Sequence, residues 1–354
     1  MAKIRKKIHR KKMKTIQKAL LAVLLIALVL FGTYAFMTTP VSGNAENVNV
    51  TIPAGSTLGD ISDILKEKCL VRIAAFYKLY VYLQGKQNDL QSGSYIFDKS
   101  MNSAQITEKL VKGAERPTTT ITVKEGHDLN RISKYLEEEG LFTADEFMAE
   151  IKNNFDYYKA QYKFLESVPA EREYKLEGYL FGDTYEVYTD STPAEVITKM
   201  LDRFDEVFKD EYYARCTERG ITVDEAVTMA SLVEREGILD SDLPTIASVF
   251  YNRLSADMLL QSCATVQYIY KDYQFTFTNS QLEVDDPYNT YVYPGLPAGP
   301  ISNFRVSALE AALYPATTDY YYLCSMNDGT GGTAFAANLD EHEANIEKYS
   351  STWE

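Results

Sequence analysis

The chain has 354 residues, 45% of them hydrophobic, which is enough apolar surface for one large or two modest folded domains. Its formal charge of −14 argues against nucleic acid as a partner, because an acidic surface repels phosphates. The charge is unevenly spread. Residues 1–18 hold nine Lys and Arg and no acid, so of the 36 basic residues 27 remain against 50 acidic ones, a balance of −23 beyond residue 18.

The segment that follows the basic tail is strongly apolar. Residues 19–36 read ALLAVLLIALVLFGTYAF and contain no charge, and a helix of about 20 such residues spans the hydrocarbon layer of a bilayer. We therefore predict a transmembrane helix over 19–37, followed by a small, polar linker at 38–47. The positive-inside rule places the basic tail, 1–18, in the cytoplasm and the remainder outside. A cleaved signal peptide, with a small-residue site at 41–43, is the alternative.

The cysteines and histidines lie far apart in the sequence. Their spacing matches neither a zinc site nor a disulfide-rich scaffold, so we expect no metal and no cofactor. The thiols are interpreted as free and buried, with one long-range disulfide as the alternative. The residues concerned are Cys69, Cys216, Cys263 and Cys324, with His9, His127 and His342.

A duplicated unit occupies the region after the linker. Residues 51–55 align with 122–126 at an offset of 71, and the same offset continues without a gap as far as Phe76 and Phe147. Each copy reads as a short strand, a Gly turn and an amphipathic helix. Between the copies, 90–97 is predicted to be a strand and 103–110 a helix capped by Ser103 and ending near Gly113. This order of elements indicates an α+β fold.

Helical patterns dominate the C-terminal half. Residues 193–216, 222–236, 243–256 and 304–314 are predicted to be helices, and 284–303 is a Pro- and Gly-dense loop of a length typical of functional loops. Tyrosines are frequent between 157 and 188, where packing in a core and stacking on sugar rings are both open interpretations.

The helix predicted over 222–236 carries the candidate catalytic residue. Thr222 and Glu225 form a capping box, and the helix is apolar around most of its surface. Glu234 lies on an apolar stripe of this helix, where burial raises the pKa of a carboxyl toward that of a general acid. The alternative is a last-turn Glu that is solvated or paired with Arg235 or Arg253.

Six sequence blocks resemble the YceG-like endolytic murein transglycosylases, in the same order along the chain. The block at 229–236, MASLVERE, is similar to the catalytic-helix signature of that family, whose first Glu is catalytic. The other blocks are 176–185 (LEGYLFGDTY), 249–254 (VFYNRL), Leu260-Gln261 with Thr265-Val266, 288–291 (YNTY) followed by 295–303 (GLPAGPISN), and Phe335 with Leu339, Glu341 and His342. The N-terminal half resembles the LysM-like module of the family.

The resemblance implies a domain order and a reaction. It implies a LysM-like module over 48–119 and a YceG-like catalytic domain of mixed α+β structure over 120–354, in a bacterial cell membrane. The implied reaction is cleavage of the MurNAc–GlcNAc bond of nascent glycan strands to give 1,6-anhydro-MurNAc ends, with Glu234 as general acid and then base. Residues expected to contact the sugar are Glu177, Asn252, Gln261, Thr265, Asn289, Tyr291 and Ser302.

Peptidoglycan is the implied substrate, and penicillin-binding proteins are the implied partners. A non-catalytic wall-binding membrane protein is one alternative. A hydrolytic muramidase is another, and it requires a second carboxylate, for which Glu177 and Asp183 are candidates. Glu236 is the rival to Glu234 and is interpreted as a secondary electrostatic group or a surface residue.

Overall fold

The computed structural model describes residues 2–114, 116–273, 277–326 and 328–349. The chain forms two compact units, residues 1–116 and 117–354. Both mix helices with short two-stranded antiparallel sheets, which confirms the α+β prediction.

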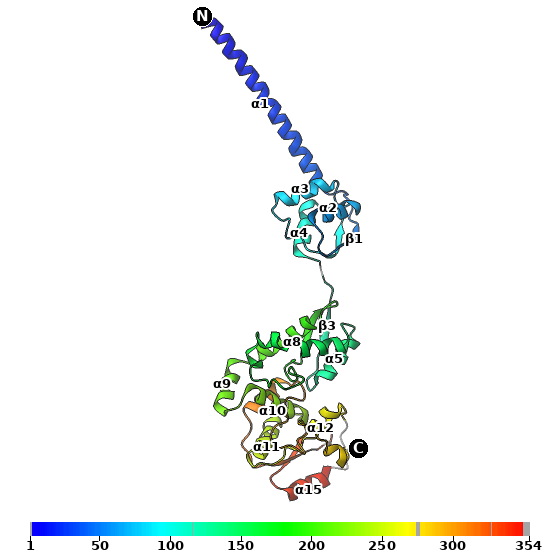
Figure 1. Ribbon diagram of the computed structural model, residues 1–354, viewed down its shortest axis with the longest axis vertical. Coiled ribbons are helices and arrows are strands. Elements are labelled where there is room, and N and C mark those ends of the chain that lie inside the picture. The colour runs from blue at the N-terminus through cyan, green and yellow to red at the C-terminus, as the bar shows by residue number, and fades with distance from the viewer. Residues whose placement is uncertain (1, 115, 274–276, 327, 350–354) are drawn as a thin grey trace. The chain divides into compact units, whose positions relative to one another are not determined.

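The first unit begins with one long helix. Helix α1 (Ala2–Thr38) contains an apolar stretch, Leu20–Thr38, that is long and apolar enough to cross a membrane, with a mean hydropathy of 2.6. This stretch differs by one residue at each end from the predicted span 19–37. The basic tail and the apolar stretch therefore belong to one continuous helix (Figure 1).

A small α+β fold follows α1. It contains β1 (Asn47–Ile52), α2 (Leu58–Glu67), α3 (Ala74–Leu83), β2 (Gly93–Asp98) and α4 (Ser103–Lys112). Strands β1 and β2 are antiparallel, with Asn47 opposite Asp98 and Ile52 opposite Gly93. Asn102 rather than Ser103 caps α4. Its side chain accepts a hydrogen bond from the backbone amide of Gln105, and the Gln105 side chain accepts one from the backbone amide of Asn102. The predicted end at Gly113 is confirmed.

The second copy of the repeat opens the second unit. Strand β3 (Thr118–Thr122) leads through a turn at Gly126 into α5 (Leu129–Glu138) and α6 (Ala144–Asn153), as β1 leads into α2 and α3. The strand–turn–helix interpretation of both copies is thus confirmed. Each copy pairs with its own later strand, and β3 lies antiparallel to β4 (Thr184–Tyr188).

The rest of the second unit is mainly helical. Short helices α7 (Phe155–Lys159) and η1 (Lys163–Leu165) precede β4, and α8 (Pro193–Val207), α9 (Asp210–Arg219), α10 (Val223–Glu236), α11 (Leu243–Ser255), α12 (Cys263–Tyr270) and α13 (Asn279–Leu282) follow it. The chain ends with α14 (Val306–Leu313), β5 (Tyr322–Ser325), β6 (Thr333–Ala336) and α15 (Leu339–Tyr349).

One predicted helix, 193–216, is wrong in its extent. The chain leaves the helical conformation at Phe208, whose ψ is 76°, and α9 begins only after Lys209. Phe208 is 2% exposed and stacks on Phe204 at 5.7 Å between ring centroids. The break therefore turns an aromatic ring into the core, which a helical pattern of apolar residues does not reveal.

Helix α10 is the centre of the second unit. Its residues from Ala226 to Val233 are all buried, and α9, α11, α12 and α14 pack around it (Figure 1). The predicted capping box is present, since Thr222 accepts from the Glu225 amide and Glu225 accepts from the Thr222 amide. The core thus fixes the position of the residues in the last turn of α10.

Candidate active site

Glu234 lies in the last turn of α10, where the buried helix reaches the surface. Gly237 ends the helix with an extended backbone, and its amide donates to the Val233 carbonyl. The Glu234 side chain is only 7% exposed. A carboxyl at the rim of a buried helix has access to a ligand while most of its surface is shielded from water.

Arg305 holds one oxygen of this carboxyl. Its Nε donates to Glu234 Oε2 at 2.9 Å, and its backbone amide donates to the same oxygen at 3.0 Å. The guanidinium also donates to the carbonyls of Gly237 and Ile238 and to Asp240, which fixes its own orientation. The alternative interpretation, in which Glu234 pairs with Arg235 or Arg253, is therefore wrong.

The second oxygen, Oε1, accepts no hydrogen bond from any described residue. It faces Gly126, where a Cβ atom would lie 3.8 Å from it. Gly126 has φ of +72°, a conformation that glycine adopts without strain, so the turn of the second repeat copy passes close to the carboxyl. Oε1 is thus the oxygen of this carboxyl that stays unbonded within the described part of the chain.

Opposing influences act on the protonation of Glu234. Burial raises the pKa of the Glu234 carboxyl above its ordinary value, because the charged form loses hydration. The bonds from Arg305 act in the opposite direction, and the negative charge of Glu125 raises the pKa further. The net pKa is raised, which favours a carboxyl that retains a proton for donation.

Two loops are fastened together beside Glu234. Asn303 donates from Nδ2 to the Lys124 carbonyl at 3.1 Å, and its Oδ1 accepts from the His127 amide at 2.9 Å. The Ile301 amide donates to Ser231 Oγ on α10 at 3.1 Å. The Pro- and Gly-dense loop and the repeat turn are therefore both fixed relative to α10, as a preorganised site requires.

Glu236 occupies the other side of the same helix end. Residues two apart on a helix point in different directions, and Glu236 Oε1 accepts from Ser262 Oγ at 2.5 Å. Burial raises the pKa of Glu236 as well, opposed by the Ser262 bond and by Arg235 and Arg253. Glu236 is a half-buried, bonded carboxyl, so its interpretation as a surface residue is wrong.

Several expected sugar-binding residues gather near Ser262, on the Glu236 side. Gln261, with φ of +48°, is exposed, and its backbone N–H donates a hydrogen bond to the Thr290 carbonyl. Thr265 is fully buried and shares a hydroxyl bond of 3.0 Å with Thr290. Tyr291 lies with its hydroxyl 3.0 Å from Cys263 Sγ. Of the three predicted residues, Gln261 and Tyr291 retain some exposure.

The other expected residues use their polar atoms within the protein. Asn289 donates to the carbonyls of Leu282 and Val284, and Asn252 donates to those of Thr318 and Tyr320. Ser302 is fully buried, and its hydroxyl has no hydrogen-bond partner among the residues that the structure describes. These contacts shape the walls of the site.

Glu177 lies in a buried cluster of its own. Both its oxygens accept from the Leu129 amide at the start of α5, and one accepts from Tyr268 at 3.2 Å. Burial, with the nearby charge of Asp128, raises the pKa of Glu177 to about 8. Asp183, the other candidate for a second carboxylate, pairs with Arg203 at 2.7 Å.

Two residues beside Glu234 were missed by the sequence analysis. Arg305 lies in the loop before α14, and Glu125 lies in the turn of the second repeat copy. The first copy has Pro53-Ala54-Gly55 at the equivalent turn, so the charged pair Lys124-Glu125 was the available signal. For Arg305 the sequence offered no comparable signal.

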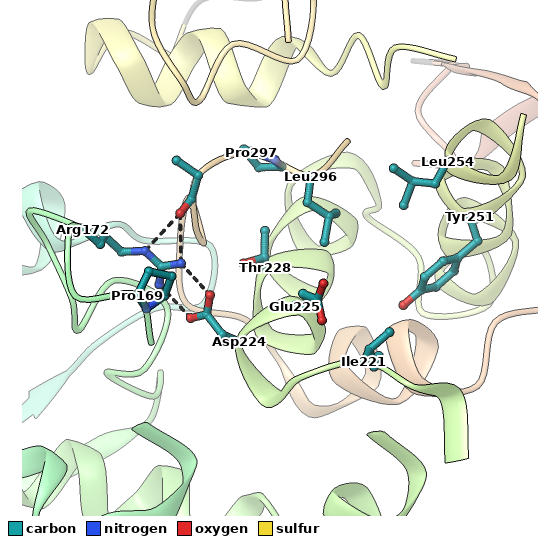
Figure 2. A pocket seen from close by; sticks show the side chains of 11 residues that line it. Pro169, Arg172, Ile221, Asp224, Glu225, Thr228, Tyr251, Leu254, Leu296 and Pro297 are labelled. Carbon is teal, nitrogen blue, oxygen red and sulfur yellow. Dashed lines mark hydrogen bonds and ion pairs between the residues drawn. The ribbon is translucent and has the colours of Figure 1, made fainter. Parts of the chain in front are cut away.

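A separate pocket lies at the opposite end of α10. It has a volume of about 560 Å³, and its wall includes Asp224, Thr228 and Tyr251 (Figure 2). Arg172 and Asp224 form a bidentate ion pair at its edge, at 2.5 and 2.7 Å. Ten residues separate Asp224 from Glu234, about 15 Å along a helix, so this pocket does not include the candidate acid.

A half-buried carboxyl with a raised pKa, bonded through one oxygen and set on an α+β scaffold, is the kind of group that enzymes use for acid–base chemistry. The sequence profile of the YceG-like family matches residues 50–348. The chain therefore belongs to the YceG-like family.

Similar proteins cover most of the chain. The endolytic murein transglycosylase of Bacillus subtilis (strain 168) is 32% identical over 334 residues, which are 92% of each chain. The endolytic murein transglycosylase of Streptococcus pneumoniae (strain D39 / NCTC 7466) is 31% identical over 88% of this chain and 60% of its own length. A crystal structure of a YceG-like protein from Listeria monocytogenes aligns with a TM-score of 0.59 and 34% identity, covering 85% of this chain and 99% of that one.

Proposed function

We propose that this chain is an endolytic lytic transglycosylase that cleaves the MurNAc–GlcNAc bond of nascent peptidoglycan strands. The carboxyl of Glu234, shielded from water and with Oε1 open, is the observation that carries the proposal. The names of the relatives in Bacillus subtilis and Streptococcus pneumoniae support the substrate class.

In the first step Glu234 acts as a general acid. Protonated Oε1 donates its proton to the glycosidic oxygen while the bond from that oxygen to C1 of MurNAc breaks, and GlcNAc leaves as an alcohol. Positive charge develops on the sugar ring. The carboxylate that remains at Glu234, together with Glu125 nearby, stabilises that charge electrostatically.

In the second step the same residue acts as a base. Glu234 accepts the proton of the C6 hydroxyl of MurNAc as that oxygen bonds to C1, which gives the 1,6-anhydro end. The proton returns to Glu234, and no water is consumed. One carboxyl suffices because the nucleophile is part of the substrate. The raised pKa suits both steps.

We assign direct sugar contacts to Gln261, which is exposed, and to Tyr291, whose half-buried aromatic ring can stack on a sugar face. The other five predicted residues, Glu177, Asn252, Thr265, Asn289 and Ser302, position the walls of the site in this proposal, because they are buried or have their polar side-chain atoms bonded within the protein.

The location follows from the N-terminal helix. We propose that Leu20–Thr38 anchors the chain in the bacterial cell membrane, with the basic tail in the cytoplasm and the second unit outside. In this proposal the first unit contains a LysM-like module, which precedes the catalytic domain in the chain. Cleavage of strands near the membrane makes penicillin-binding proteins the proposed partners.

Mass spectrometry of digested glycan tests the reaction. Purified peptidoglycan is incubated with the detergent-solubilised full chain, either wild type or Glu234→Gln. We expect anhydro-MurNAc ends from the wild type and a loss of at least about 10³-fold for Glu234→Gln, because Gln cannot transfer the proton. Glu236→Gln is the matched variant, since it neutralises the other half-buried carboxyl of the same turn, and it is expected to retain the product.

Other products would support other functions. Reducing MurNAc ends would indicate a muramidase, which needs a second carboxylate. Glu125 would be the candidate, because its charge raises the pKa of Glu234. Binding to glycan without any new ends would indicate a wall-binding protein. Circular dichroism of each variant verifies that the fold is retained.

A further inference from the structure

Helix α3 has two apolar faces, and only one of them is buried. Tyr77 and Val81 point into the core of the first unit and are at most 2% exposed. The outward face carries large apolar side chains. Among them Leu79 is 47%, Tyr82 67% and Leu83 63% exposed. Apart from the exposed Lys78, α3 is apolar around its circumference, and such a helix normally lies inside a protein or in contact with a membrane.

The outward residues form one continuous stripe. Phe76, Leu79, Tyr80 and Leu83 follow the i, i+3, i+4, i+7 spacing of a single helix face, and Ile73 extends the stripe by one turn at its N-terminal end. Single exposed apolar residues are common on proteins, but a contiguous stripe of aromatic and aliphatic side chains indicates an interaction surface.

Contacts within the first unit fix α3 against the end of the apolar stretch of α1. The rings of Tyr34 and Tyr80 lie 6.4 Å apart. The guanidinium of Arg72, just before α3, lies 4.5 Å over the Phe36 ring and donates to the Pro40 carbonyl at 2.7 Å. In Figure 1, α3 lies at the C-terminal end of α1.

These contacts determine the depth of α3 in a membrane. If Leu20–Thr38 spans the bilayer, its last turn lies where hydrocarbon gives way to headgroups, about 28 Å from its first residue. Tyr80 touches that last turn, so the outward face of α3 lies at the same level. Tyrosine is enriched in this interfacial layer, and phenylalanine and leucine occur on the apolar face of helices that lie in it.

We propose that the outward face of α3 docks into the interfacial layer of the same bilayer that holds α1. The surface consists of Ile73, Phe76, Leu79, Tyr80, Tyr82 and Leu83. The first unit is then held on the membrane surface by two attachments, the α1 span and the α3 face. This proposal rests on the membrane anchoring proposed above.

Fluorescence quenching in vesicles tests the docking. The full chain, with the exposed thiol removed by Cys69→Ser, carries one environment-sensitive label at Leu83→Cys, Glu108→Cys or Leu25→Cys. It is reconstituted in phosphatidylcholine–phosphatidylglycerol vesicles that contain lipid spin-labelled near the headgroup or along the chain. Leu83 and Glu108 are both exposed, on α3 and α4, so their replacement leaves the core intact.

Docking predicts quenching at position 83 by shallow spin labels, quenching at 25 by deeper ones, and none at 108. Quenching at 25 with position 83 as unquenched as 108 would overturn the docking and leave the anchor proposal standing. Absence of quenching at both 25 and 83 would overturn the anchor and the docking together. A further variant, Leu79→Gln with Ile73→Gln, is expected to reduce the quenching at 83 at least twofold while that at 25 stays unchanged.

Discussion

The backbone amide and the Nε of Arg305 both donate to Oε2 of Glu234, and Oε1 of the same carboxyl stays open beside Gly126. This arrangement distinguishes the two oxygens of one carboxyl. Oε2 serves as the fixed point, and Oε1 is the oxygen to which the proposed mechanism assigns the proton transfer. The hydrogen bond from the backbone N–H of residue 305 remains possible after any substitution except proline. The contribution of the Arg305 side chain can therefore be measured separately.

Replacing Arg305 by Met should change the pH dependence of the enzyme. The Arg305 guanidinium lowers the pKa of Glu234, so its removal raises that pKa further. The acid is then protonated up to a higher pH, and the alkaline limb of kcat/KM moves upward. Loss of positioning is expected to reduce kcat by up to about 100-fold. A pH–rate profile of anhydro-product formation measures both effects, and an unchanged alkaline limb would contradict the electrostatic role.

Replacing Glu125 by Gln should have the opposite effect on the same limb. The Glu125 charge raises the pKa of Glu234, so the variant lowers it, and the alkaline limb moves to lower pH. If Glu125 also stabilises the positive sugar ring, kcat falls about tenfold or more. Arg305→Met and Glu125→Gln thus form a matched pair. Shifts in the same direction in both variants would show that Glu234 does not control the limb.

The local features of the fold were predictable because their signals are contiguous in the sequence. Thr222 and Glu225 identify the start of α10, and the 71-residue offset identifies two strand–turn–helix units. Each of these features depends on residues within a few turns of one another. Glu234 was predicted in the same way, as an acid on an otherwise apolar helix.

The partners of Glu234 depend on the folding of distant segments. Arg305 is 71 residues further along the chain, and Glu125 precedes Glu234 by more than 100 residues. Nothing in the local pattern around 305 indicates that its guanidinium will meet a carboxylate. The same limitation explains Asn289 and Thr265, whose residue types suit sugar binding but whose side chains are bonded internally.

Neutralising Glu177 should change stability in a pH-dependent manner. The pKa of Glu177 is raised from 4.5 to about 8 in the folded protein, chiefly by burial. Between these values the unfolded chain has lost a proton that the folded chain keeps, so the free energy of unfolding falls as pH rises toward about 8. The Glu177→Gln variant has no group that titrates at this position, so its free energy of unfolding does not fall with pH for this reason. Its melting temperature relative to wild type should therefore rise from pH 5 to 8 and stay level above that.

Thermal unfolding followed by circular dichroism measures this difference in the full chain. Glu166→Gln is the control, because it removes the same charge from an exposed position and should show no such trend. A difference between Glu177→Gln and wild type that is constant with pH would mean that Glu177 is charged in the folded protein at neutral pH.

The ion pair between Arg172 and Asp224 is buried at the first turn of α10, with side chains 4% and 9% exposed. Tyr179 also donates to Asp224, and Arg172 donates to the Ala298 carbonyl in the Pro- and Gly-dense loop (Figure 2).

Asp224→Ala leaves the guanidinium buried without its counter-charge, and we expect a loss of about 3–5 kcal/mol in the free energy of unfolding. Arg172→Met together with Asp224→Ala removes both charges, so the double variant should recover part of that loss. Chemical denaturation of Asp224→Ala, Arg172→Met and the double variant closes a double-mutant cycle with wild type, and additive losses would show that the two residues do not stabilise the loop as a pair.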